Sequence, residues 1–132
     1  MQKTLALFLF AILMSGAGCF VRSLHPMYTE RDLVFEPALL GEWSEAGSKE
    51  LWNFSRDDEN GYIFVHTDED GRRGNFRARL AKIGDAFFLD LVPVSPESKG
   101  NLVHELHFLP VHSFLHLERV APTLRMRAPD PD

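Results

Sequence analysis

From Glu42 to Val92, apolar and polar residues alternate in short runs that are separated by turns rich in Gly and Asp. Alternation of this kind places apolar side chains on one face of a strand, and turn signals about every 8 to 12 residues are typical of an antiparallel all-β domain. Further strands are expected after the loop at 93–100. The pattern predicts an antiparallel meander of seven to eight strands, either a curled sheet or a closed barrel.

Four turns predict the register of the meander, because residues directly opposite each other share a face. We interpret Gly47-Ser48 and Gly84-Asp85 as two-residue loops, and 58–61 and 68–71 as four-residue loops. The expected opposed pairs are Trp43–Trp52, Phe54–Val65, Ile63–Phe76 and Leu80–Leu89. The residues that this register places on one apolar face are Trp43, Trp52, Phe54, Ile63, Val65, Phe76, Ala78, Leu80, Phe87, Leu89 and Leu91.

The other face of the predicted sheet is mostly polar, although the same register also leaves Tyr62, Phe64 and Phe88 on it. Asp90 stands within an apolar run on this face, where Arg79 is expected directly opposite. We therefore expect a cross-strand ion pair between Arg79 and Asp90.

The chain has 132 residues, a formal net charge of -5 and one cysteine. That length fits a single domain, and one cysteine excludes an internal disulfide, so stability must come from a packed core. The acidic balance argues against nucleic acid as a partner. The segments that we expect are a signal peptide at 1–18, a tether with short helical turns at 19–41, the β domain at 42–128 and a tail at 129–132.

The N-terminal segment has the pattern of an export signal. Lys3 precedes the unbroken apolar run Leu5–Met14, and small residues then lead to Cys19. The run is shorter than the about 20 residues that cross a bilayer, so it has the size of the apolar part of a signal peptide.

Ala17, Gly18 and Cys19 resemble the lipobox of bacterial lipoproteins. The resemblance implies that the Cys19 thiol receives a diacylglyceryl group, that cleavage falls before Cys19 and that the new amine is acylated. Two or more acyl chains hold a protein stably on a membrane, whereas one does so only marginally. The implied location is the cell envelope, and the outer membrane in a Gram-negative cell because Phe20 is not aspartate. An ordinary cleavage site that releases a periplasmic or secreted protein, and an uncleaved anchor, are the alternatives.

Gly41-Glu42-Trp43, behind a short helical turn, resembles the Gly-x-Trp signature of lipocalin-like barrels, in which the tryptophan closes one end of the barrel. The longer stretch from His25 to Trp43 is similar to small bacterial lipoproteins of unassigned function. These resemblances imply a β-rich domain and a location, and they imply no activity.

Four histidines lie close together in the sequence: His104, His107, His112 and His116. His112 and His116 share a strand face at about 13 Å along the strand, given about 3.3 Å per residue, which is too far for both to bind one metal ion. Solvated histidines on a strand are the simpler interpretation. The two Asp-rich turns lack the glutamate that closes a calcium loop, so turn chemistry explains their composition.

We therefore expect a lipid-anchored envelope protein with a binding or structural domain, no cofactor and no catalytic activity. Its candidate ligand face is bordered by Trp43, Trp52 and Phe54, and its partner is a small apolar ligand or an envelope protein. The alternative is a secreted metal-dependent or hydrolytic enzyme that uses the histidine-rich segment 104–116.

Overall fold

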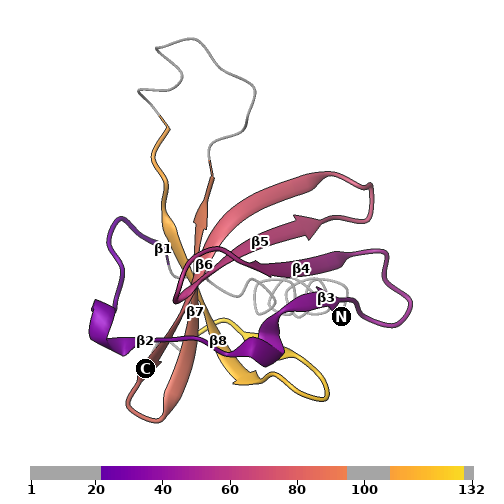
Figure 1. The fold of residues 1–132 in the computed structure, drawn as a ribbon. Coiled ribbons are helices and arrows are strands. Elements are labelled where there is room, and N and C mark those ends of the chain that lie inside the picture. The colour runs from indigo at the N-terminus through magenta and orange to yellow at the C-terminus, as the bar shows by residue number, and fades with distance from the viewer. Residues whose placement is uncertain (1–21, 95–107, 130–132) are drawn as a thin grey trace, which may run out of the picture.

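The computed structural model describes residues 22–94 and 108–129, and within these ranges nine strands form one sheet (Figure 1). The segment 22–41, for which short helical turns are expected, contains the 3-10 turns η1 (Glu30–Asp32) and η2 (Pro37–Leu39). The strands are β1 (Arg22–Ser23), β2 (Leu33–Val34), β3 (Gly41–Trp43), β4 (Leu51–Arg56), β5 (Gly61–Thr67), β6 (Arg73–Ile83), β7 (Ala86–Pro93), β8 (His112–Arg119) and β9 (Arg125–Arg127).

The sheet is an antiparallel meander in which each strand from β3 to β8 pairs with the next. Both β1 and β9 pair with the outer edge of β8, and β2 pairs with β6. Among the described strands, β3 and β9 are not hydrogen-bonded to each other, so the sheet stays open. The all-β antiparallel meander is confirmed, and the closed, lipocalin-like barrel is wrong because β3, a strand of three residues, pairs with β4 alone.

Two of the four expected turns give the expected register. Trp43 lies opposite Trp52, and Leu80 lies opposite Leu89 across the β6–β7 hairpin. Gly84 in that hairpin adopts a φ of +62°, a left-handed conformation that glycine reaches without steric strain.

The predicted register is wrong by one residue at both of the turns that flank β5. Phe64 lies opposite Phe54 on one side and opposite Phe76 on the other, in the places expected for Val65 and Ile63. A slip of one residue moves every side chain of a strand to the other face. The first slip places the side chains of β5 on the face opposite to the predicted one, and the second slip returns the side chains of β6 to their predicted face. Relative to the prediction, β5 alone is therefore inverted.

Both slips arise because the loops are one residue shorter than expected. The Asp57 amide donates to the Gly61 carbonyl at 3.1 Å, and the Asp68 amide donates to the Arg72 carbonyl at 2.9 Å, so each loop has three residues. Gly71 closes the second loop with a φ of +80°, the left-handed conformation that is common at the last residue of a three-residue hairpin loop.

The core lies on the face of the sheet that carries Phe54, Phe64 and Leu80. The inversion of β5 also brings Tyr62 into this core, where it is fully buried. Its hydroxyl accepts from the Glu36 amide at 2.7 Å and donates to the Glu36 carbonyl at 3.2 Å. The buried residues that pack together are Leu39, Phe54, Tyr62, Phe64, Ala78, Leu80, Leu89, Leu91, Leu115 and Leu117.

The N-terminal segment 22–34 is part of the sheet rather than a free tether. β1 pairs with the start of β8, and β2 pairs with β6 at Leu80 and Ala81. Between these strands, the side chain of Asp32 accepts a hydrogen bond from the Thr29 amide at 2.8 Å, which lowers the pKa of Asp32. Within the described residues, the segment 22–34 therefore packs as part of the sheet, although the alternation pattern places the start of the β domain at 42.

Candidate functional site

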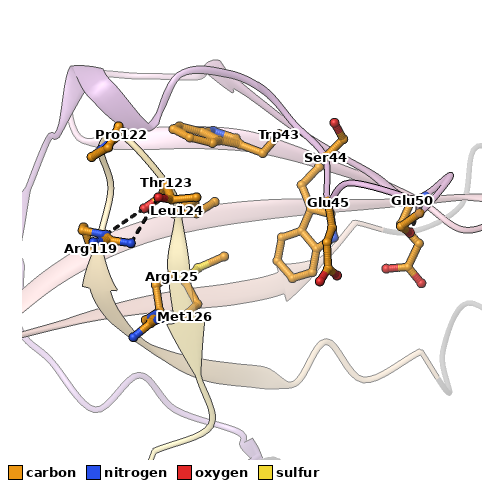
Figure 2. Close-up of a pocket in the computed structure, with 12 residues that line it drawn as sticks. Trp43, Ser44, Glu45, Glu50, Arg119, Pro122, Thr123, Leu124, Arg125 and Met126 are labelled. Carbon is orange, nitrogen blue, oxygen red and sulfur yellow. Dashed lines mark hydrogen bonds between the residues drawn. The ribbon is translucent and has the colours of Figure 1, made fainter.

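An open cavity of about 610 Å³ lies between the β3–β4 hairpin and the β8–β9 hairpin. Trp43 and Trp52 line it from the first hairpin. Leu124 and Met126 line it from the second, and Figure 2 shows them with Trp43. We call this space the Trp cavity. Because β3 and β9 are not paired, the cavity occupies the seam where the curled sheet fails to close.

The backbone before β3 holds Trp43 in place. The Glu36 side chain accepts from the Ala38 amide at 2.9 Å and caps η2, whose last residue, Leu39, is fully buried. The indole nitrogen of Trp43 donates to the Leu39 carbonyl at 2.9 Å. The polar end of this indole is thus satisfied by the protein.

Trp52 is supported from behind by an aromatic cluster. Its ring lies 5.1 Å from that of Phe64 and 5.5 Å from that of His66, measured between ring centroids. Phe54 stacks on Phe64 at 4.6 Å and is itself only 2% exposed. Of the three residues predicted to border a ligand, the structure places Trp43 and Trp52 at the cavity wall, whereas Phe54 lies in the core beneath it.

The two sides of the Trp cavity carry opposite charges. Glu45 and Glu50 lie on the β3–β4 side, and Arg119 and Arg125 lie on the β8–β9 side (Figure 2). Arg119 donates to the carbonyl and the hydroxyl of Thr123 at 3.3 and 3.1 Å, which fixes its position at the wall. The cavity therefore offers an apolar wall between an acidic side and a basic side.

A second polar cluster lies on the opposite face of the sheet. Asp90 is only 2% exposed, and its Oδ2 accepts a hydrogen bond from the Tyr28 hydroxyl at 2.6 Å. His112 Nδ1 lies 2.6 Å from the same oxygen. Because a carboxylate only accepts hydrogen bonds, His112 carries its proton on Nδ1. Asp90 Oδ1 is buried without a partner in the described part of the chain.

This cluster replaces the ion pair that the sequence predicts. Arg79 lies opposite Asp90 in the register, as expected, but its guanidinium pairs with Asp58 at 2.9 Å. The expected ion pair between Arg79 and Asp90 is therefore wrong. The N-terminal segment brings Tyr28 onto Asp90, which the alternation pattern alone does not reveal. Burial, with help from the hydrogen bond to Asp90, raises the pKa of Tyr28 well above its usual range.

The structure separates the histidines that it describes. His112 is bound to Asp90, and the ring of His116 stacks on Phe88 at 5.3 Å. His104 and His107 lie outside the described residues, as does Cys19. Within 22–94 and 108–129, no three His, Cys, Asp or Glu side chains gather closely enough to hold a metal ion.

The alternation pattern identifies the tryptophans of the β3–β4 hairpin, but it misses the β8–β9 wall of the cavity. Leu124 and Met126 alternate with arginines in the sequence, which predicts their strand and not its position across from Trp43. No helix in the described part of the chain combines the length and apolarity needed to span a membrane. Comparison with family models, with curated proteins and with solved structures finds no match to this chain.

Proposed function

We propose that this chain is a lipid-anchored envelope protein whose β domain binds a small, mainly apolar ligand in the Trp cavity. The anchor is Cys19, and the apolar run Leu5–Met14 followed by Ala17-Gly18-Cys19 supports it. A thiolate is the nucleophile that accepts a diacylglyceryl group, and a lone cysteine directly behind an export signal is otherwise hard to explain.

The Trp cavity is the observation that carries the binding proposal. Small-molecule sites are concave, mostly apolar and about 300–1,000 Å³ in volume, and a volume of about 610 Å³ lies in this range. Two tryptophans offer a large, stiff contact surface at a low cost in conformational entropy. The glutamates on one side and the arginines on the other favour a ligand with an apolar body and polar ends.

Binding is proposed rather than catalysis because the buried His112–Asp90 pair, the described arrangement best suited to acid–base chemistry, lies away from the cavity. Asp90 and His112 stand on the opposite face of the sheet from Trp52, and they are engaged with each other and with Tyr28. We propose that this cluster holds the N-terminal segment on the sheet.

The two tryptophans of the chain both line the cavity, so the tryptophan fluorescence of the protein reports on this site alone. We suggest titrating residues 20–132, which include every described contact of the fold, with the uncharged probe N-phenyl-1-naphthylamine. Energy transfer from tryptophan to the bound probe is expected. Met126→Gln keeps the length of the side chain but makes the wall polar, and about tenfold weaker binding is expected, equivalent to about 1.4 kcal/mol.

Met27→Gln is the matched control, because Met27 is 49% exposed and does not line the cavity. It should bind the probe as tightly as the wild type. Urea unfolding of both variants establishes that each is folded. Equal probe affinity in the two variants, or no energy transfer in the wild type, would contradict binding in the Trp cavity.

A further inference from the structure

Four large apolar side chains are exposed in the described part of the chain. Leu109 is 69% exposed, Leu24 is 61%, Met27 is 49% and Val94 is 42%. We call these residues the anchor-side patch. Single exposed apolar residues are common on protein surfaces, but a group of them at one place marks an interaction site.

The strand pairing puts Leu24, Val94 and Leu109 at one end of the sheet, and Met27 follows Leu24 by three residues. Ser23 lies opposite His112 at the start of β8, and Leu24 follows directly. Leu91 of β7 lies opposite Ser113, so Val94 leaves β7 at the end where Leu109 approaches β8. In Figure 1, β1 and the adjoining ends of β7 and β8 lie on the same side of the molecule.

The patch is also the part of the domain closest to the proposed anchor. Arg22 is paired with Ser113, and it follows Cys19 by three residues. Three residues span at most about 11 Å even when fully extended. The hydrogen bond between Tyr28 and Asp90 holds the following segment on the sheet, so any release of residues from the fold that lengthens the link stops before Tyr28 while this bond is intact.

We propose that the anchor-side patch lies in the interface of the lipid bilayer and orients the domain on the membrane. This proposal rests on the lipid at Cys19 that is proposed above. Apolar side chains that enter the boundary between headgroups and acyl chains add to the anchor in proportion to the area that they bury. The net charge of -5 disfavours electrostatic attraction to anionic lipid, so the contact is apolar in character and insensitive to salt.

The proposed orientation leaves the Trp cavity open to water. The patch lies at the His112 end of β8, and the cavity lies at its Arg119 end. Seven steps of about 3.3 Å separate these ends by about 23 Å. A domain docked through the patch therefore holds its ligand site away from the bilayer.

The test uses the lipidated protein in phosphatidylcholine vesicles. Because lipidation blocks the Cys19 sulfur, a cysteine introduced as Leu24→Cys or as Leu109→Cys is the only free thiol and takes an environment-sensitive nitrobenzoxadiazole label. Asp85→Cys, in the exposed β6–β7 turn at the other end of the sheet, is the control. At both patch positions we expect blue-shifted emission and quenching by nitroxide-labelled lipid, and we expect the same result at low and at high salt. The label at Asp85→Cys should emit as it does in water.

A further variant asks whether the apolar side chains cause the insertion. With the label at Leu109→Cys, the substitutions Leu24→Asn and Val94→Asn should reduce lipid quenching if the patch enters the bilayer. The intact mass of each sample separates the two proposals. A diacylglyceryl mass combined with water-like emission at Leu24 and Leu109 would overturn the docking and leave the proposed function standing, whereas an unmodified Cys19 would contradict the proposed function itself.

Discussion

Removing one hydroxyl should show whether the N-terminal segment is an integral part of the fold. Tyr28→Phe keeps the ring and deletes the group that donates to Asp90 at 2.6 Å. His112 remains as the partner of Asp90 Oδ2, so the variant does not leave the carboxylate without any hydrogen bond. The expected effect is a loss of stability with no change of fold.

The magnitude follows from the environment of Asp90. A hydrogen bond to a charged group contributes about 1.5–3 kcal/mol. This range applies because the acceptor is buried: Asp90 is 2% exposed, and its Oδ1 has no partner in the described part of the chain. We therefore expect Tyr28→Phe to lower the free energy of unfolding by about 2 kcal/mol, which corresponds to roughly 8 °C in Tm for a domain of about 100 residues.

The assay is urea unfolding followed by tryptophan fluorescence, carried out as a double-mutant cycle with Asp90→Asn. Residues in contact have coupling energies of about 0.5–3 kcal/mol, whereas independent residues are additive within about 0.5 kcal/mol. If Tyr28→Phe changed stability by less than about 0.5 kcal/mol and showed no coupling to Asp90→Asn, segment 22–34 would be a loose tether, and the reasoning about the anchor-side patch would lose its basis.

Three further predictions test the fold and its pH dependence. Burial raises the pKa of both tyrosines, Tyr28 and Tyr62, so their neutral forms stabilise the fold below about pH 10, and this contribution is lost as the pH rises through the raised pKa values. In a pH titration, the phenolate absorbance at 295 nm should rise at a higher pH than that of free tyrosine. A titration midpoint near pH 10 would be inconsistent with the burial. Gly84→Ala should reduce stability by about 1–2 kcal/mol in a thermal melt because the φ of Gly84 is +62°; no loss would show that the turn does not need this conformation. Leu80→Ala should reduce stability by about 2–5 kcal/mol in urea because Leu80 is fully buried; a loss below about 1 kcal/mol would argue against the core described above.

The sequence predicts the hairpins well and the inversion of β5 poorly, for a physical reason. Asp-x-x-Gly fits both a four-residue loop and a three-residue loop, and only the side chains on the two faces can distinguish them. In the structure the glycine ends the second loop as the left-handed Gly71, whereas Gly61 after the first loop already belongs to β5. One signal was present. The four-residue interpretation left Tyr62 and Phe64 on the polar face, whereas the three-residue loops bury both residues completely or nearly so.

The N-terminal segment and the cavity depend on contacts between distant residues. Tyr28 and Asp90 are 62 positions apart, and nothing in the local pattern around Tyr28 indicates its partner. Asp90 itself is visible in the sequence as a lone carboxylate in an apolar run, which signals a buried polar contact without naming its partner. Likewise, Trp43 and Met126 are recognisable as strand residues, but only the curl of the whole sheet brings them to the same cavity.

The central claim is that Cys19 carries the anchor of a binding domain, and the mass of the mature N-terminal peptide tests it most directly. Membranes from cells that produce the wild-type chain and the Cys19→Ser variant would be digested and analysed by mass spectrometry. The account predicts a wild-type peptide that begins at Cys19 and carries a diacylglyceryl group and an acylated amine, with no such peptide in the variant. A wild-type protein that begins at another residue, with an unmodified cysteine or with Cys19 removed, would contradict it.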